Sequence, residues 1–203
     1  MWIPIALSRD VPNGVTRAVI LEERELVIWR SQGGVAQVWE DRCPHRGMRL
    51  SFGFVRGEAL NCLYHGWQYG TSAGCQKIPA HPDLVVPNTI RANAYPLVER
   101  GQLIWTRLSA ETTAPELPAA LPVASIAVDA DADAILALCA AAPQGGAQIF
   151  AVDFDGMTLQ IGWHESRAGR TMLHATLRSS ADLARALAAL RRLRTDAERR
   201  VAP

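Results

Sequence analysis

The chain has 203 residues, which is enough for one large domain or two small ones. Apolar residues make up 49% of it and charged residues 20%, and the formal net charge is only +1. This balance excludes the strong basic field that is typical of proteins bound to nucleic acid or to acidic membranes. No run of about 18 apolar residues indicates a membrane span, and no secretory leader is evident, so we expect a cytoplasmic protein.

The first half of the sequence predicts short β-strands. The runs are rich in Val, Ile and Trp, and Asn13-Gly14 and Gly33-Gly34 supply turn residues beside them. No helical period separates them, which favours an antiparallel β sandwich or barrel. The expected strands are 17–21, 25–29, 34–39, 52–55, 59–62, 67–69 and 102–106.

The second half indicates a smaller α+β region that ends in a helix. Residues 109–122 are rich in proline and alanine and read as a linker. A short helix over 131–142 then precedes three strands, of which the last two form a hairpin through Ala168-Gly169. Ser180 is a suitable N-cap for a closing helix that runs to about residue 200. The expected strands are 149–154, 158–164 and 171–178.

Two short motifs combine cysteine with histidine. Cys43 and His45 form a Cys-x-His motif, and Cys62 and His65 form a Cys-x-x-His motif further along the chain. A Rieske 2Fe–2S cluster needs two thiolates on one iron and two imidazoles on the other. Two loops that each offer one cysteine and one histidine can supply that set, each loop contributing one ligand to each iron.

A zinc site is the alternative for this ligand set, because two thiolates and two imidazoles can also bind zinc in a tetrahedron. Zinc sites usually group their cysteines in one motif and their histidines in another, whereas here the two types alternate. Gly47 and Gly66 directly after the motifs fit loops that turn tightly beside a cluster and leave backbone N–H groups for its sulfur atoms. The pattern therefore favours one Rieske-type 2Fe–2S cluster.

The motifs CPHRG at 43–47 and CLYHGW at 62–67 resemble the Rieske domain of the bacterial Rieske non-haem iron oxygenases, the ring-hydroxylating dioxygenases and oxidative demethylases. The resemblance extends over 1–108. It implies a Rieske β sandwich or barrel with a small cluster-binding subdomain, followed by a linker at 109–122 and a small domain at 123–203. It also places Arg46, Gly47, Tyr64, Gly66 and Trp67 around the ligands, where Arg46 and Trp67 either contact a partner or serve local packing.

The large subunits of this family carry a mononuclear iron on two histidines and a carboxylate in a larger catalytic domain. Here His164 and His174 stand on neighbouring predicted strands with Asp153, Asp155 and Glu165 nearby, and ordinary strand histidines are the simpler interpretation. We therefore expect no catalytic residues of its own in the chain. Residues 123–203 are then interpreted as a reduced remnant of the catalytic domain.

These expectations make the chain an electron-transfer component or noncatalytic subunit of a bacterial oxygenase system. Its expected partners are a reductase and a catalytic oxygenase subunit, in a hetero-oligomer, with neither nucleic acid nor a membrane involved. Two alternatives remain. The chain could be a complete small oxygenase or demethylase with iron on His164, His174 and a carboxylate, or a redox-sensing module.

Overall fold

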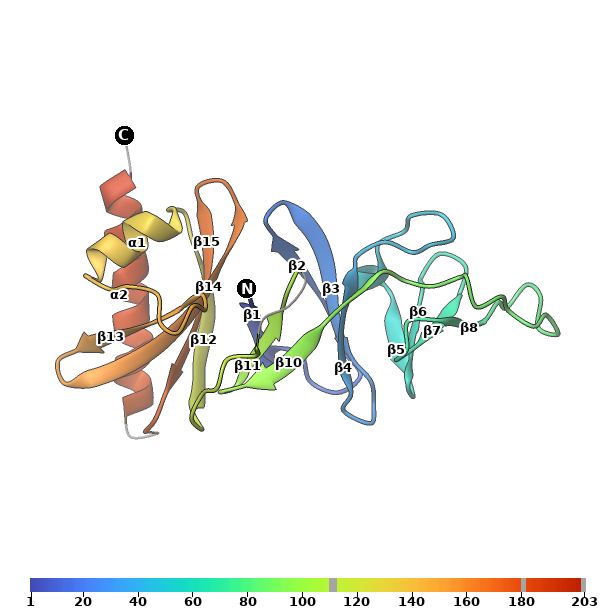
Figure 1. The fold of residues 1–203 in the computed structure, drawn as a ribbon, viewed down its shortest axis with the longest axis horizontal. Helices are drawn as coiled ribbons and strands as arrows, with labels where there is room; N and C mark the ends of the chain where they lie inside the picture. Colours follow the sequence, from blue (N-terminus) through green and yellow to red (C-terminus); the bar gives the residue numbers. More distant parts are fainter. Residues whose placement is uncertain (110–112, 180–181, 202–203) are drawn as a thin grey trace. The chain divides into compact units, whose positions relative to one another are not determined.

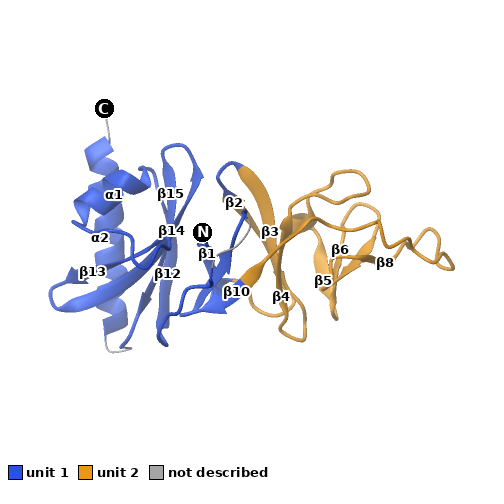
Figure 2. Ribbon diagram, in the orientation of Figure 1, with its two compact units in different colours: residues 1–10, 21–23, 98–203 blue, residues 11–20, 24–97 orange. Residues whose placement is uncertain are grey.

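The computed structural model describes residues 1–109, 113–179 and 182–201, which divide into two compact units (Figure 2). Unit 1 comprises residues 1–10, 21–23 and 98–203, and unit 2 comprises residues 11–20 and 24–97. The expected boundaries at 108 and 122 do not coincide with this division, because the first ten residues pack with the C-terminal half. Within the described residues, neither helix combines the length and apolarity needed to cross a membrane.

Unit 2 is built from two antiparallel four-stranded sheets (Figure 1). The first has the order β2-β3-β4-β9 and the second the order β5-β6-β7-β8. Trp29, Trp39, Tyr69 and Leu50 are fully buried in the core, which also contains Cys43 and Cys62. The strands are β2 (Thr16–Leu21), β3 (Arg24–Arg30), β4 (Ala36–Glu40), β5 (Phe54–Arg56), β6 (Ala59–Asn61), β7 (Gln68–Gly70), β8 (Cys75–Lys77) and β9 (Ala94–Tyr95).

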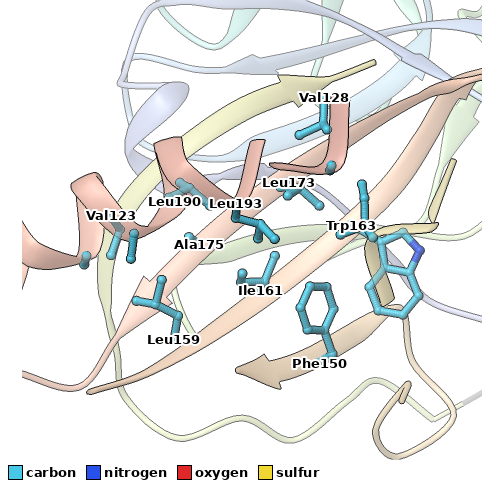
Figure 3. Packing of buried hydrophobic residues seen from close by; sticks show 14 of the residues in the cluster. Val123, Val128, Phe150, Leu159, Ile161, Trp163, Leu173, Ala175, Leu190 and Leu193 are labelled. Atoms are coloured by element: carbon cyan, nitrogen blue, oxygen red, sulfur yellow. The ribbon is translucent and has the colours of Figure 1, made fainter. Parts of the chain in front are cut away.

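Unit 1 contains a three-stranded sheet, β1-β11-β10, and a four-stranded sheet, β12-β15-β14-β13. Its helices are α1 (Ala132–Leu138) and α2 (Leu183–Val201). Leu190 and Leu193 of α2 pack with Ile161 and Ala175 of the four-stranded sheet (Figure 3). The strands are β1 (Ile3–Leu7), β10 (Leu97–Arg100), β11 (Leu103–Thr106), β12 (Leu121–Val128), β13 (Ile149–Phe154), β14 (Met157–Arg167) and β15 (Arg170–Leu177).

The mainly β class, the antiparallel pairing and the closing helix confirm the expectations from the sequence. The hairpin through Ala168-Gly169 is also present, between β14 and β15. The expected cap Ser180 lies outside the described residues. Strands β1, β8, β9, β10 and β12 were not expected from the sequence. Strands β1 and β12 each contain a proline. In both, the register shifts directly after that residue, at Pro4 and at Pro122, so each proline occupies a bulge where a ladder hydrogen bond is not required.

A chain of buried and half-buried polar groups ties the N-terminal residues to the four-stranded sheet of unit 1. Ser125 Oγ donates to Asp10 Oδ2 at 2.5 Å and lies 2.8 Å from Nδ1 of His174. Nε2 of His174 lies 3.2 Å from Nδ1 of His164, which in turn lies 3.0 Å from the carbonyl oxygen of Pro4. Both imidazoles are almost completely buried. The chain therefore links the segment around β1 to β12, β15 and β14.

We expect the substitution His174→Leu to lower the free energy of unfolding by about 1–3 kcal/mol, because it leaves the buried partners of this imidazole unsatisfied. The measurement is urea denaturation followed by circular dichroism. His81→Leu is the control, since His81 is exposed and should change stability by less than about 0.5 kcal/mol. A stable His174→Leu protein that has lost one bound iron would contradict the structural role and support the second-iron alternative.

Candidate metal centre

The first candidate loop follows β4 and spans Cys43 to Met48. Two backbone hydrogen bonds close it. The Cys43 N–H donates to the Met48 carbonyl and the Gly47 N–H donates to the Cys43 carbonyl, both at 2.8 Å. Gly47 has φ of +72°, a conformation that glycine adopts without strain. The loop then leads into a short 3-10 turn over Leu50–Phe52.

The second candidate loop has the same closure, although its cysteine and histidine are spaced differently. It joins β6 to β7, the Cys62 N–H donates to the Trp67 carbonyl, and the Gly66 N–H donates to the Cys62 carbonyl, both at 2.9 Å. Gly66 has φ of +69°, close to the value at Gly47. The two loops are therefore equivalent six-residue turns from cysteine to the closing residue, with the glycine four residues after each cysteine.

The two thiols form an inner pair at the edge of the unit 2 core. Cys43 and Cys62 are each 2% exposed, and the two thiols interact with each other. The Tyr69 hydroxyl lies 3.2 Å from Cys43 Sγ. Burial raises the pKa of Cys62, the neighbouring Cys43 raises it further, and the backbone N–H groups of Tyr64 and His65 directed at its sulfur oppose these effects. A thiolate at Cys62 therefore forms readily only when a cation compensates its charge.

The two imidazoles form an outer pair. The ring centroids of His45 and His65 are 4.9 Å apart, and His45 is half-buried while His65 is exposed. Trp67 stacks on His45 at 4.1 Å with an interplanar angle of 8°. Burial and then the positive charges of His65 and Arg46 lower the pKa of His45. A lowered pKa keeps this imidazole neutral, which is the form that binds metal.

The residues present fit a 2Fe–2S cluster of mixed ligation. The donor set divides spatially into a buried thiol pair and an accessible imidazole pair, as a centre with one thiolate-bound and one imidazole-bound iron requires. Among the described residues, no three His, Cys, Asp or Glu side chains converge on a point where one metal ion could sit. The four candidate ligands therefore present two pairs and not one compact tetrahedron.

The residues expected around the ligands lie in the two loops. Tyr64 packs against His65 with ring centroids 3.8 Å apart, and Arg46 is exposed beside His45. Tyr69 was not anticipated from the sequence. It lies on β7, directly after the second loop, and its side chain is fully buried beside Cys43, a placement that no local pattern in the sequence indicates. Burial and the adjacent Cys43 raise the pKa of Tyr69, so its hydroxyl stays protonated and available as a donor.

Two further cysteines stand apart from the proposed ligand set. Cys75 is buried on β8, opposite Tyr69, and burial raises its pKa. Cys139 lies half-buried at the end of α1, where burial raises its pKa to about 11. His164 and His174 hydrogen-bond to each other, and the acidic side chain connected to them through Ser125 is Asp10. Of the carboxylates suggested from the sequence, Asp153 accepts from the N–H of Gly156 and Glu165 from the N–H of Ala132.

Residues 1–95 match the family model of the Rieske [2Fe-2S] domain. The oxidoreductase NdmD of Pseudomonas putida is 37% identical over 147 residues, which are 68% of this chain and 25% of that protein. The oxygenase subunit of 3-chlorobenzoate-3,4-dioxygenase from Comamonas testosteroni is 34% identical over 120 residues, 58% of this chain and 28% of that protein. This chain therefore spans only about a quarter of the length of these relatives.

The fold extends this similarity over the whole chain. The solved structure of NdmA from Pseudomonas putida CBB5 superimposes with a TM-score of 0.73 at 21% identity, covering 99% of this chain and 80% of that one. At this identity the match shows a common fold. The matched family model and the oxygenase-subunit relative from Comamonas testosteroni show that residues 1–95 are a Rieske [2Fe–2S] domain like that of the Rieske oxygenases, and the family model shows that the cofactor of this chain is a Rieske-type 2Fe–2S cluster.

Proposed function

We propose that this chain is the electron-transfer component of an oxygenase system, with Cys43 and Cys62 holding one iron and His45 and His65 the other. The observation that carries the proposal is the pair of equivalent loops that place two thiols in the core and two imidazoles at the surface. When bound, the cluster supplies reversible one-electron transfer at a potential raised by its neutral imidazole ligands.

The protein side chains around the cluster have distinct tasks. Burial of Cys43 and Cys62 excludes water from the sulfur side, and the hydroxyl of Tyr69 is placed to donate to Cys43. Trp67 stacks on His45 and fixes the plane of that ring. His65 remains exposed, so a partner protein can come into contact with the imidazole edge, where the path for an electron is shortest. This division places the sulfur atoms in the core and the exchange of electrons at the surface.

The proposed partners are a reductase that supplies single electrons and a catalytic oxygenase subunit that consumes them. The coverage of the whole chain by an oxygenase fold supports the interpretation of residues 123–203 as a reduced catalytic domain. The engagement of His164 and His174 in internal contacts supports placing the catalytic iron on a partner chain. A cytoplasmic hetero-oligomer is the assembly consistent with this role.

Metal analysis of anaerobically purified protein is the first test. We expect two irons and two acid-labile sulfides per chain, a red-brown colour, and uptake of one electron per chain in a redox titration. His65→Ala should abolish the colour because it removes a ligand, whereas His81→Ala should retain it. A third iron with the same sulfide content would favour the complete oxygenase. A colourless protein that holds zinc after anaerobic reconstitution would overturn the proposal.

The substitution Tyr69→Phe should lower the reduction potential by roughly 40 mV. A hydrogen bond to a thiolate stabilises the more negative, reduced state, and about 1 kcal/mol corresponds to ~40 mV for one electron. Spectroelectrochemical titration measures the shift. Tyr95→Phe is the matched control, because the Tyr95 hydroxyl lies near Asn93 and should leave the potential unchanged. Equal potentials for Tyr69→Phe and the wild type would show that this hydroxyl does not interact with the cluster sulfur.

A further inference from the structure

A polar groove adjoins the first cluster loop on the surface of unit 2. Two hollows of about 460 and 320 Å³ share Glu40, Arg42, Gly47 and Asn93 in their walls, so they form one continuous depression, called here the loop-1 groove. The smaller hollow is also lined by His45. A molecule that fills the groove therefore contacts a side chain that we assign to the cluster.

The carboxylates of the loop-1 groove are already engaged by its own residues. Asp41 is buried and accepts hydrogen bonds from the backbone N–H and the hydroxyl of Ser51. Glu25 forms an ion pair with Arg49. Glu40 accepts from Asn93 Nδ2 at 3.3 Å. Only Glu25 is neutralised by a cation, but five arginines line the groove against these three carboxylates, so its walls carry a net positive charge.

Three arginines of the loop-1 groove, in contrast to its carboxylates, are not engaged by neighbouring side chains in the part of the chain that the structure describes. Arg24, Arg42 and Arg46 are all exposed, and within the described residues none of the three forms an ion pair or donates a side-chain hydrogen bond. Arg91, also in the wall, donates to the carbonyl of Ser72. Across unit 2, lysine and arginine outnumber aspartate and glutamate nine to five, although the whole chain carries a net charge of only +1. Positive charge is therefore concentrated on the unit that holds the cluster.

The second cluster loop presents a different surface. Leu63 and Tyr64 are 58% and 53% exposed. Exposed apolar side chains suit a lasting subunit contact, whereas a charged groove suits a carrier that must associate quickly and leave after each electron. The charged groove thus has the chemistry of a transient contact with an electron donor.

Building on the proposed function, we propose that the loop-1 groove is the docking site of an acidic electron-donor protein, whose carboxylates pair with Arg24, Arg42 and Arg46. Guanidinium groups bind carboxylates in bidentate geometry, so they orient a partner as well as attract it. Seated there, the donor lies against His45 and delivers one electron directly to the cluster. The donor is oxidised and the cluster is reduced by that electron, without a further reactant.

The test is stopped-flow reduction of the cluster-loaded protein by a reduced acidic plant-type 2Fe–2S ferredoxin. The variant R24E/R42E should lower the second-order rate constant at least ~10-fold at low salt, because steering by complementary charge raises association rates by factors of about 10 to 1,000. The wild-type rate should fall toward that of the variant as salt rises. Arg46 is left unchanged because it adjoins His45. R56E, on an exposed arginine outside the groove, should change the rate less than about twofold.

Iron, sulfide and reduction potential are measured first for each variant, and reduction by neutral reduced lumiflavin serves as the reference for an accessible cluster. Absence of the cluster from the wild type would overturn the proposed function itself. An intact cluster that the ferredoxin reduces at the same rate in R24E/R42E and wild type would overturn only the docking proposal. A wild-type rate independent of salt would also overturn it. The docking proposal would likewise be overturned if R24E/R42E accepts electrons at the wild-type rate but fails to pass them to a catalytic subunit, because the groove would then bind the electron acceptor.

Discussion

The closure of the two cluster loops is the constraint on which the rest of the metal centre depends. Each loop returns a glycine N–H to the cysteine carbonyl and the cysteine N–H to the carbonyl of the closing residue. These hydrogen bonds satisfy the backbone N–H and C=O groups of the turns, which have no partner in a helix or a strand. They also fix the direction of each cysteine side chain, so that two thiols from distant parts of the sequence meet beside Tyr69.

The difference in burial between thiols and imidazoles gives the centre an inner side of thiols in the core and an outer side of imidazoles at the surface. The thiols belong to a core that includes Trp29, Trp39 and Tyr69, with aromatic rings packed edge-on behind Cys43. A low-dielectric wall strengthens every hydrogen bond to sulfur and makes an uncompensated thiolate costly. The imidazoles, in contrast, carry no charge when they bind metal and lose little by facing water. The sequence order of cysteine before histidine in each loop thus becomes an order from core to surface.

The chemistry of the centre was more predictable from the sequence than its surroundings. Cysteine and histidine are uncommon residues, so their spacing alone indicated the donor set, and glycine after each motif indicated the turn. The expected strands of the first half agree with most of the observed ones, because Val, Ile and Trp runs report burial. The prediction missed β1 and β12, which contain Pro4 and Pro122, and it missed β8, β9 and β10, which are too short to show an alternating pattern. The position of Tyr69 and the loop-1 groove depend on long-range packing, which local pattern does not encode.

The grouping of the N-terminal residues with the C-terminal half has a physical cause that bears on the role of unit 1. Strand β1 pairs with β11, and Pro4 approaches β14 so closely that a Cβ at Gly162 would lie 2.7 Å from the proline ring. Glycine at that position is therefore required by packing. The same approach brings the Pro4 carbonyl to His164 and Asp10 to Ser125, which places the two histidines at the centre of an internal network. Both histidines thus contribute buried contacts that hold the β1 segment against β12, β14 and β15. This packing role supports our proposal that the oxygen chemistry belongs to a partner chain.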